Sequence, residues 1–202
     1  MPKERSLNER FASLERKMSD SHILLDSGKA NELNFFIFDY DPKQELIVRN
    51  EVRKLKKNNP NIIEFDLFNI VIELLENQGY LERVKDFETQ YDSSTLLSQL
   101  FQPFLSLEED KNPILDYVNE HLIDDDNHIV LITGVGKVYP FIRSHTILNK
   151  LQSVIRNAPV VMMYPGRYNQ KASMCLRLFD RLEDDNYYRA FSLEERMVKD
   201  EN

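Results

Sequence analysis

Apolar residues in this chain fall into two patterns, short continuous runs and stripes at helical spacing. Short apolar runs bounded by turn residues are typical of strands buried on both faces. The runs predict strands over 34–39, 62–65, 128–133, 159–163, 174–179 and 187–191. Two segments between these runs read as turns, namely Tyr164–Gly166 and Leu182–Asn186.

Helical stripes fill most of the remaining chain. The first predicted helix spans 6–18, where Ser6 with Glu9 three residues later forms a capping box. Proline can begin a helix and aspartate can cap one, so both mark helix starts in this chain. We predict further helices after Pro42, after Asp66, across most of residues 80–122, and from Pro140 to Leu151.

The alternation of strands and helices determines the expected architecture. Strands separated by helical stretches form βαβ units, which produce parallel strands with helices on the sheet faces. We therefore expect an α/β fold, a three-layer βαβ sandwich with a mostly parallel central sheet and an N-terminal helix. We expect a single domain over 1–202, with an N-terminal helical extension over 1–30 and a polar tail over 192–202.

Composition narrows the class of protein. The 202 residues are 42% hydrophobic and 30% charged, which is ordinary for a globular chain. Cys175 is the only cysteine, so we expect no internal disulfide and a reducing compartment. The N-terminus lacks the apolar stretch of a secretory signal, and no apolar run is long enough to cross a membrane. These features predict a cytoplasmic protein that does not bind membranes.

Charge is unevenly distributed along the chain. The formal net charge of -8 argues against broad non-specific binding to nucleic acid. Between Thr133 and Phe191, however, nine basic residues stand against four acidic ones, a local charge of +5. This segment is therefore the part of the chain that we expect to favour an acidic partner surface or a phosphate.

One glycine-rich turn is a candidate anion site. Gly134, Gly136 and Lys137 follow a predicted strand, where backbone N–H groups can approach a phosphate. The segment departs from a nucleotide-binding P-loop, because Leu131 stands where that motif has its first glycine and Val138 where it has Ser or Thr. The alternative interpretation is a plain strand-to-helix turn whose glycines relieve backbone strain.

Two aspartates close the first predicted strand. Asp39 and Asp41 resemble the nucleophile loop of haloacid-dehalogenase-type phosphatases, in which one aspartate attacks phosphorus beside Mg²⁺. Lys43 replaces the Thr or Val of that motif, and aspartates after strands are also common caps and turn formers. The four histidines lack metal-ligand spacing. We therefore expect no metal or cofactor, and a magnesium-dependent phosphatase stays open only as an alternative.

Aromatic and basic residues cluster together in the C-terminal part of the chain. Tyrosine and arginine are frequent anchors of protein interfaces, and they also stack on single-stranded bases. Many such rings instead fill a core, so three interpretations stay open here: a partner surface, a nucleic-acid-binding module or internal packing. The candidate partner-binding residues are Lys137, Tyr139, Arg143, Arg167, Tyr168, Tyr187, Tyr188 and Arg189.

The same segment resembles a known family. Three blocks, GVGKVYPFIRSHTILNKLQ (134–152), PVVMMYPGRYN (159–169) and LRLFDRLEDDNYYRAF (176–191), are similar to those of BrxB, a small component of bacterial BREX phage-exclusion systems. The run NFFIFDYDP (34–42) resembles that family's first strand. The likeness extends from about the first helix to Phe191, but the family offers no catalytic residues to transfer.

This resemblance implies a role in antiviral defence without a catalytic activity. BREX operons also encode PglZ, which resembles alkaline phosphatases, together with a DNA methyltransferase and a large ATPase. The resemblance implies an assembly or adaptor subunit that binds PglZ first of all, or else the ATPase or the methyltransferase. It further implies a contribution to phage restriction and self-DNA methylation, with DNA contacted only through partners.

Overall fold

A computed structural model describes residues 5–18, 34–101, 105, 112–125, 127–169, 175–184 and 190–193. Its centre is a seven-stranded sheet in which five strands follow the order β2-β3-β4-β1-β7 and run parallel. The fold is therefore the expected α/β class with a mostly parallel sheet. The five strands are β1 (Phe35–Tyr40), β2 (Ile62–Asp66), β3 (Ile129–Thr133), β4 (Val160–Asn169) and β7 (Phe191–Ser192).

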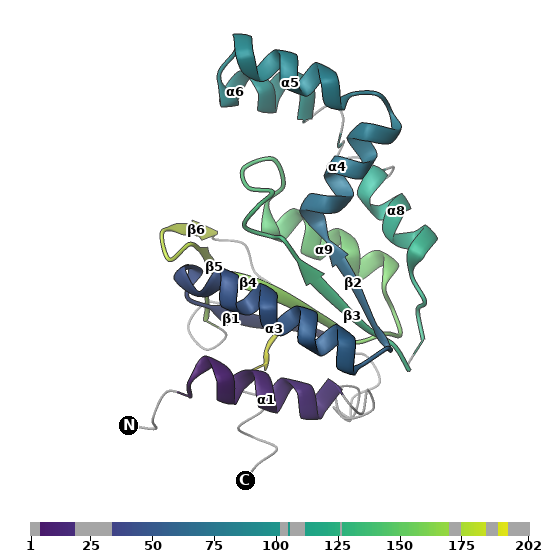
Figure 1. Cartoon of the computed structure of the whole chain (residues 1–202), viewed down its shortest axis with the longest axis vertical. Helices are drawn as coiled ribbons and strands as arrows, with labels where there is room; N and C mark the ends of the chain where they lie inside the picture. The colour runs from purple at the N-terminus through teal and green to yellow at the C-terminus, as the bar shows by residue number, and fades with distance from the viewer. Residues whose placement is uncertain are drawn as a thin grey trace.

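Helices cover both faces of this sheet, which makes three layers (Figure 1). On one face lie α1 and α3, whose side chains pack against alternate residues of the central strands, such as Phe36 and Phe38 of β1. On the other face lie α4, α8 and α9, which pack against the intervening residues, such as Phe35 and Ile37. The helices are α1 (Leu7–Met18), α3 (Glu45–Asn58), α4 (Leu67–Asn77), α8 (Pro113–His121) and α9 (Ser144–Val154).

Connections between the strands explain where these helices lie. The chain leaves β1 through a short 3-10 turn, η1 (Pro42–Gln44), and α3 then returns it to β2 at the far edge of the sheet. In the residues that the structure describes, the connection from β2 to β3 is mostly helical, as expected for residues 80–122. Besides α4 and α8 it contains α5 (Leu81–Gln90), α6 (Ser93–Leu96) and a π-helical turn, η2 (Leu97–Phe101).

Helix starts agree with the capping residues in the sequence. The Ser6 backbone N–H donates to Glu9 Oε2 at 2.7 Å while the Glu9 N–H donates to Ser6 Oγ, which is the reciprocal pattern of a capping box. Asp66 caps α4 by accepting from the N–H groups of Phe68 and Asn69. Each cap satisfies backbone donors that the first helical turn leaves without partners.

Three predicted boundaries are wrong, and two of them lie at prolines. Pro140 does not begin a helix, because residues 135–141 form successive turns and α9 starts at Ser144. Proline favours tight turns as readily as the first position of a helix. The predicted turn Tyr164–Gly166 is part of strand β4. The first half of β4, up to Pro165, pairs with β1, and the second half, from Gly166 onward, pairs with another strand.

That other strand belongs to an antiparallel hairpin at the end of the sheet. β5 (Cys175–Leu178) pairs with β4, and β6 (Leu182–Asp184) pairs with β5. The turn thus lies at residues 179–181 instead of the predicted Leu182–Asn186, and Phe179 and Asp180 adopt the positive φ angles that a tight hairpin needs. Of the strand predicted over 187–191, residues 187–189 lie outside the described part of the chain.

Candidate functional site

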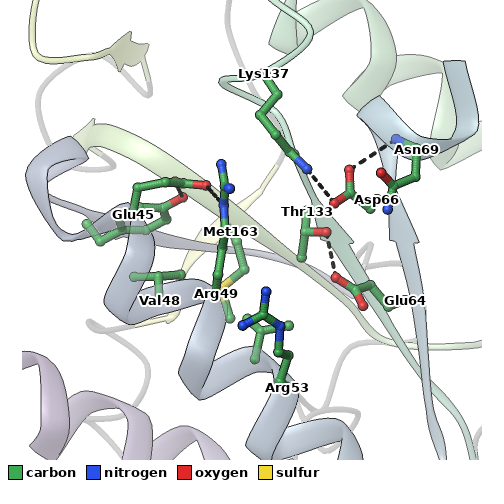
Figure 2. Close-up of a pocket in the computed structure, with 13 residues that line it drawn as sticks. Glu45, Val48, Arg49, Arg53, Glu64, Asp66, Asn69, Thr133, Lys137 and Met163 are labelled. Atoms are coloured by element: carbon green, nitrogen blue, oxygen red, sulfur yellow. Dashed lines mark hydrogen bonds and ion pairs between the residues drawn. The ribbon is translucent and has the colours of Figure 1, made fainter. Parts of the chain in front are cut away.

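A pocket opens at the carboxyl edge of the parallel strands, where ligands of open α/β sheets commonly bind (Figure 2). One wall is α3, which contributes Arg49 and Arg53. The opposite wall is formed by the ends of β2 and β3 and by the turn that follows β3. Because α3 crosses from β1 to the far edge of the sheet, the side of the helix that carries Arg49 and Arg53 borders the pocket opposite these strand ends.

Asp66 organises the wall formed by β2 and the turn. One of its carboxylate oxygens, Oδ1, accepts from the first N–H groups of α4, and the other, Oδ2, lies 2.6 Å from Lys137 Nζ. Gly134 has a φ of +76°, and a Cβ atom at this position would overlap Asp66 Oδ1. The glycine-rich turn therefore encloses the chain's own carboxylate at the N-terminus of α4.

This arrangement gives the candidate phosphate-binding residues internal contacts. Lys137 pairs with Asp66 and lies 5.2 Å from the centre of the Phe68 ring. Gly136 packs so closely on Pro165 and Phe179 that a Cβ atom would lie 2.9 Å from each side chain. Anion binding by Gly134, Gly136 and Lys137 thus stays a prediction, and these contacts provide a structural reason for each residue type.

The other carboxylates of the pocket are also hydrogen-bonded. Tyr40 donates to Glu45 Oε2 at 2.5 Å, and Arg49 Nε donates to Glu45 Oε1 at 2.8 Å. Burial of the Tyr40 ring, followed by its hydrogen bond to Glu45, raises the pKa of the phenol far above its ordinary value. Both effects favour the neutral phenol, which is the form that donates a hydrogen bond to Glu45.

Glu64 on β2 is held in a similar way. It accepts from Thr133 Oγ1 at 2.7 Å and pairs with Lys56 Nζ at 2.6 Å. Its side chain is only 19% exposed, so these contacts offset the cost of partly burying a charge. Together with Glu45 and Asp66, it leaves the pocket with three carboxylates that already have cationic partners within the chain.

Arg53 differs from the other pocket cations. Its side chain is exposed, and its NH1 group donates to the neutral Asn50 Oδ1 at 2.7 Å. In the described part of the chain it has no carboxylate partner. No candidate residue predicted from the sequence lies on α3, although five basic and two acidic residues fall within Glu45–Asn58.

The two aspartates of the phosphatase alternative have structural contacts. Asp39 Oδ1 lies 3.0 Å from Arg10 NH2 on α1, and Oδ2 accepts from the Tyr168 N–H on β4 at 3.0 Å. Asp41 caps η1 by accepting from the Lys43 N–H. The Asp39 contacts connect α1 and β4 to the end of β1, and each aspartate thus has a structural role.

The structure separates the candidate partner-binding residues. Tyr168 is buried, and its hydroxyl donates to the Ala190 carbonyl at 2.7 Å, so this ring belongs to the core. Arg143 and Arg167 are exposed, and Tyr139 is 37% exposed. Tyr187, Tyr188 and Arg189 lie outside the described residues.

Tyr139 and Arg167 each contact the turn between β5 and β6. The Tyr139 ring packs edge-on against Phe179, with ring centres 6.4 Å apart. Arg167 Nε lies 3.6 Å from Asp180 Oδ1, and both side chains are about half exposed. The turn thus gathers two of the predicted residues at the surface, and their role in partner binding stays a prediction.

Within the described ranges, no group of three or more His, Cys, Asp or Glu side chains is arranged to hold a metal ion. The same part of the chain contains no helix that is both long and apolar enough to cross a membrane.

Comparison with known proteins identifies similar sequences. The model of the family described as "BREX protein BrxB" matches residues 63–193. A protein named BREX protein BrxB from Bacillus cereus (strain H3081.97) is 40% identical over 194 residues, which cover 94% of this chain and 98% of that protein. One of the same name from Escherichia coli O9:H4 (strain HS) is 30% identical over 190 residues, covering 93% and 91%. No solved structure matches the chain.

Proposed function

Because this chain belongs to the BrxB family of BREX proteins, we propose that it is a non-catalytic assembly subunit of a BREX antiviral complex. We propose PglZ as its direct partner, with the BREX ATPase or methyltransferase as the next candidates. In this role the chain acts in the cytoplasm, supports phage restriction and self-DNA methylation, and contacts DNA only through its partners.

The main support for this proposal is that the carboxylates of the pocket form ion pairs within the chain. In doubly wound folds the carboxyl edge of the sheet is the usual place for catalytic groups. Here Glu45, Glu64 and Asp66 each pair with a cation of the same chain. Asp39, the nucleophile of the phosphatase alternative, pairs with Arg10. Carboxylates that are paired in this way stabilise the fold. An edge of the sheet that contains them suits a protein that offers a binding surface, such as an assembly subunit.

The turn between β5 and β6 is our starting candidate for the binding face. Tyr139 and Arg167 lie there, and Arg143 is exposed just before α9. Arginine and tyrosine are over-represented among residues that dominate binding energy. Association steered by such exposed charges is expected to weaken with added salt.

Co-purification tests this proposal. The chain is expressed with PglZ from the same operon and passed over a size-exclusion column at low and at moderate salt. We expect one joint peak at low salt that is reduced by Arg143→Ala and Arg167→Ala, whereas Arg83→Ala on α5 leaves it unchanged. Separate elution at both salt concentrations would exclude PglZ as a direct partner, and the ATPase and methyltransferase would then be tested in the same way.

A further inference from the structure

Helix α3 is strongly basic within an acidic protein. It contains five basic and two acidic residues, a formal charge of +3, while the whole chain carries -8. Its buried stripe, Val48, Val52 and Leu55, faces the sheet. Helix α3 lies at the front of the molecule in Figure 1, and its outer side presents most of this charge to solvent.

Two cations on this outer side have no carboxylate to neutralise them. Arg49, Lys54 and Lys56 pair with Glu45, Glu51 and Glu64, respectively. Arg53 and Lys57 are exposed and make no ion pair with any residue that the structure describes. They lie four positions apart, so their side chains project from the same side of the helix.

Two exposed apolar side chains lie near these cations, toward the start of the helix. Leu46 is 72% exposed and Ile47 is 48% exposed. Leu46 precedes Arg53 by seven residues, or two helical turns, which places it about 10 Å away along the same side. Ile47 is one position further along, about 100° around the helix, so it flanks the line of Leu46, Arg53 and Lys57. Single exposed leucines are common, but an exposed leucine in line with two unneutralised cations, with a second exposed aliphatic residue beside it, favours a partner that is both acidic and apolar.

We infer that this outer surface of α3, formed by Leu46, Ile47, Arg53 and Lys57, is a docking site for an acidic, amphipathic segment of the partner protein. This inference rests on the proposed assembly function. The partner supplies carboxylates to Arg53 and Lys57, spaced about one helical turn apart, and places an apolar side chain over Leu46 and Ile47. Opposite charges and a shared apolar contact are what a complementary interface requires.

Nucleic acid fits the surface less well. Glu45, Glu51 and Glu64 lie beside the basic residues and repel a continuous phosphate backbone, as does the net charge of the chain. The exposed apolar residues are aliphatic, so they lack the aromatic faces on which bases stack. A second copy of the chain would bring the same basic surface against itself, which opposes like charges.

The test compares two matched charge reversals in the full chain. Arg53→Glu/Lys57→Glu changes α3, and Arg83→Glu/Lys85→Glu makes the same change on α5, where both side chains are also exposed. We expect the α3 variant to bind purified PglZ at least about tenfold more weakly, whereas the α5 variant binds as the unchanged chain does. Circular dichroism of each variant checks that the fold persists.

A second pair of variants examines the apolar part of the surface. Leu46→Ser on α3 is expected to weaken binding several-fold, while Ile123→Ser, at a site that is 50% exposed before β3, is expected to have no effect. Both changes remove an exposed aliphatic side chain without altering charge. The comparison therefore separates an apolar contact from general electrostatic attraction.

The outcomes separate failure of this inference from failure of the proposed function. If the unchanged chain binds PglZ and the α3 variants bind equally well, or if both charge reversals weaken binding alike, the α3 site is wrong and the assembly function stands. If the unchanged chain binds none of PglZ, the ATPase and the methyltransferase, both the α3 site and the assembly function are wrong. The α3 site is also overturned if Arg53→Glu/Lys57→Glu abolishes binding of single-stranded DNA or self-association and leaves PglZ binding intact.

Discussion

At the scale of single residues, carboxylates with several partners determine the local structure. Asp66 caps α4, pairs with Lys137 and requires a glycine at position 134. Asp39 connects α1 to β4 through Arg10 and the Tyr168 N–H. Charges that make such contacts are costly to disturb, because removing one partner leaves a partly buried group unsatisfied.

The contact between Arg10 and Asp39 leads to the first prediction. We expect Asp39→Ala to lower the free energy of unfolding by about 1–3 kcal/mol, because the Tyr168 N–H and the Arg10 guanidinium lose an acceptor. In a double-mutant cycle with Arg10→Ala, measured by urea unfolding, we expect a coupling energy of at least about 0.5 kcal/mol. If the effects of Asp39→Ala and Arg10→Ala were additive, the two side chains would not be coupled. As a control, the effects of Asp39→Ala and Arg83→Ala, at a distant site, should be additive.

Gly134 leads to the second prediction. We expect Gly134→Ala to lower the free energy of unfolding by at least about 2 kcal/mol, since both a positive φ and overlap with Asp66 Oδ1 oppose a side chain. Gly79 has a similar φ of +69° but no atom within 4 Å of a Cβ position. Gly79→Ala should therefore cost only the backbone term, about 1 kcal/mol. Equal losses in thermal or urea unfolding would contradict the proposed role of Asp66.

At the scale of elements, helix α1 is part of the folded core. Its residues Phe11, Leu14 and Met18 are buried in the same apolar cluster as the strand residues Phe38 and Met163. The Phe11 and Phe38 rings lie 4.9 Å apart. Although α1 begins the chain and is separated from β1 by a long segment, its apolar stripe contributes to the layer that also contains α3.

Truncating a buried side chain of α1 tests this contribution. Leu14 is fully buried, so we expect Leu14→Ala to lower the free energy of unfolding by about 2–5 kcal/mol in urea titrations. Leu46→Ala removes the same atoms from an exposed position on α3 and should change stability by less than about 0.5 kcal/mol. If the two substitutions had the same small effect, α1 would not be packed as the structure shows.

At the scale of the whole molecule, one sheet joins two apolar clusters. Alternate residues of the same strand enter opposite clusters, as Phe35 and Phe36 of β1 do. Neither helical layer can therefore separate from the sheet without exposing apolar strand residues. We propose that the two layers fold together as one domain.

This proposal predicts a single cooperative unfolding transition. The midpoint measured by far-ultraviolet circular dichroism should coincide with that measured by fluorescence of the nine tyrosines, because the chain contains no tryptophan. Coincident midpoints are expected in both urea and heat. Two separate transitions, or binding of a hydrophobic dye between them, would show that the layers unfold independently.

The sequence by itself determined the fold class and most of the elements. Apolar runs and stripes, together with the Ser6 and Asp66 caps, are local signals, so the strands β1 to β3 and the helices α1 and α4 could be predicted without tertiary information. The family resemblance was equally readable from the order of the blocks between residues 134 and 191. The helix start placed at Pro140 failed, because one proline signals a turn and a helix equally well.

Only the tertiary structure decided which side chains meet. Lys137 was predicted as a candidate for binding a partner or an anion, and the structure adds that it pairs with Asp66, which is 71 residues away in the sequence. Tyr168 was predicted at an interface, and it is buried with its hydroxyl bonded to Ala190. The docking surface of α3 depends on which cations are paired. Arg49, Lys54 and Lys56 pair with carboxylates, whereas Arg53 and Lys57 pair with none that the structure describes. Local sequence records residue type and spacing, whereas exposure and pairing depend on contacts made across the sheet.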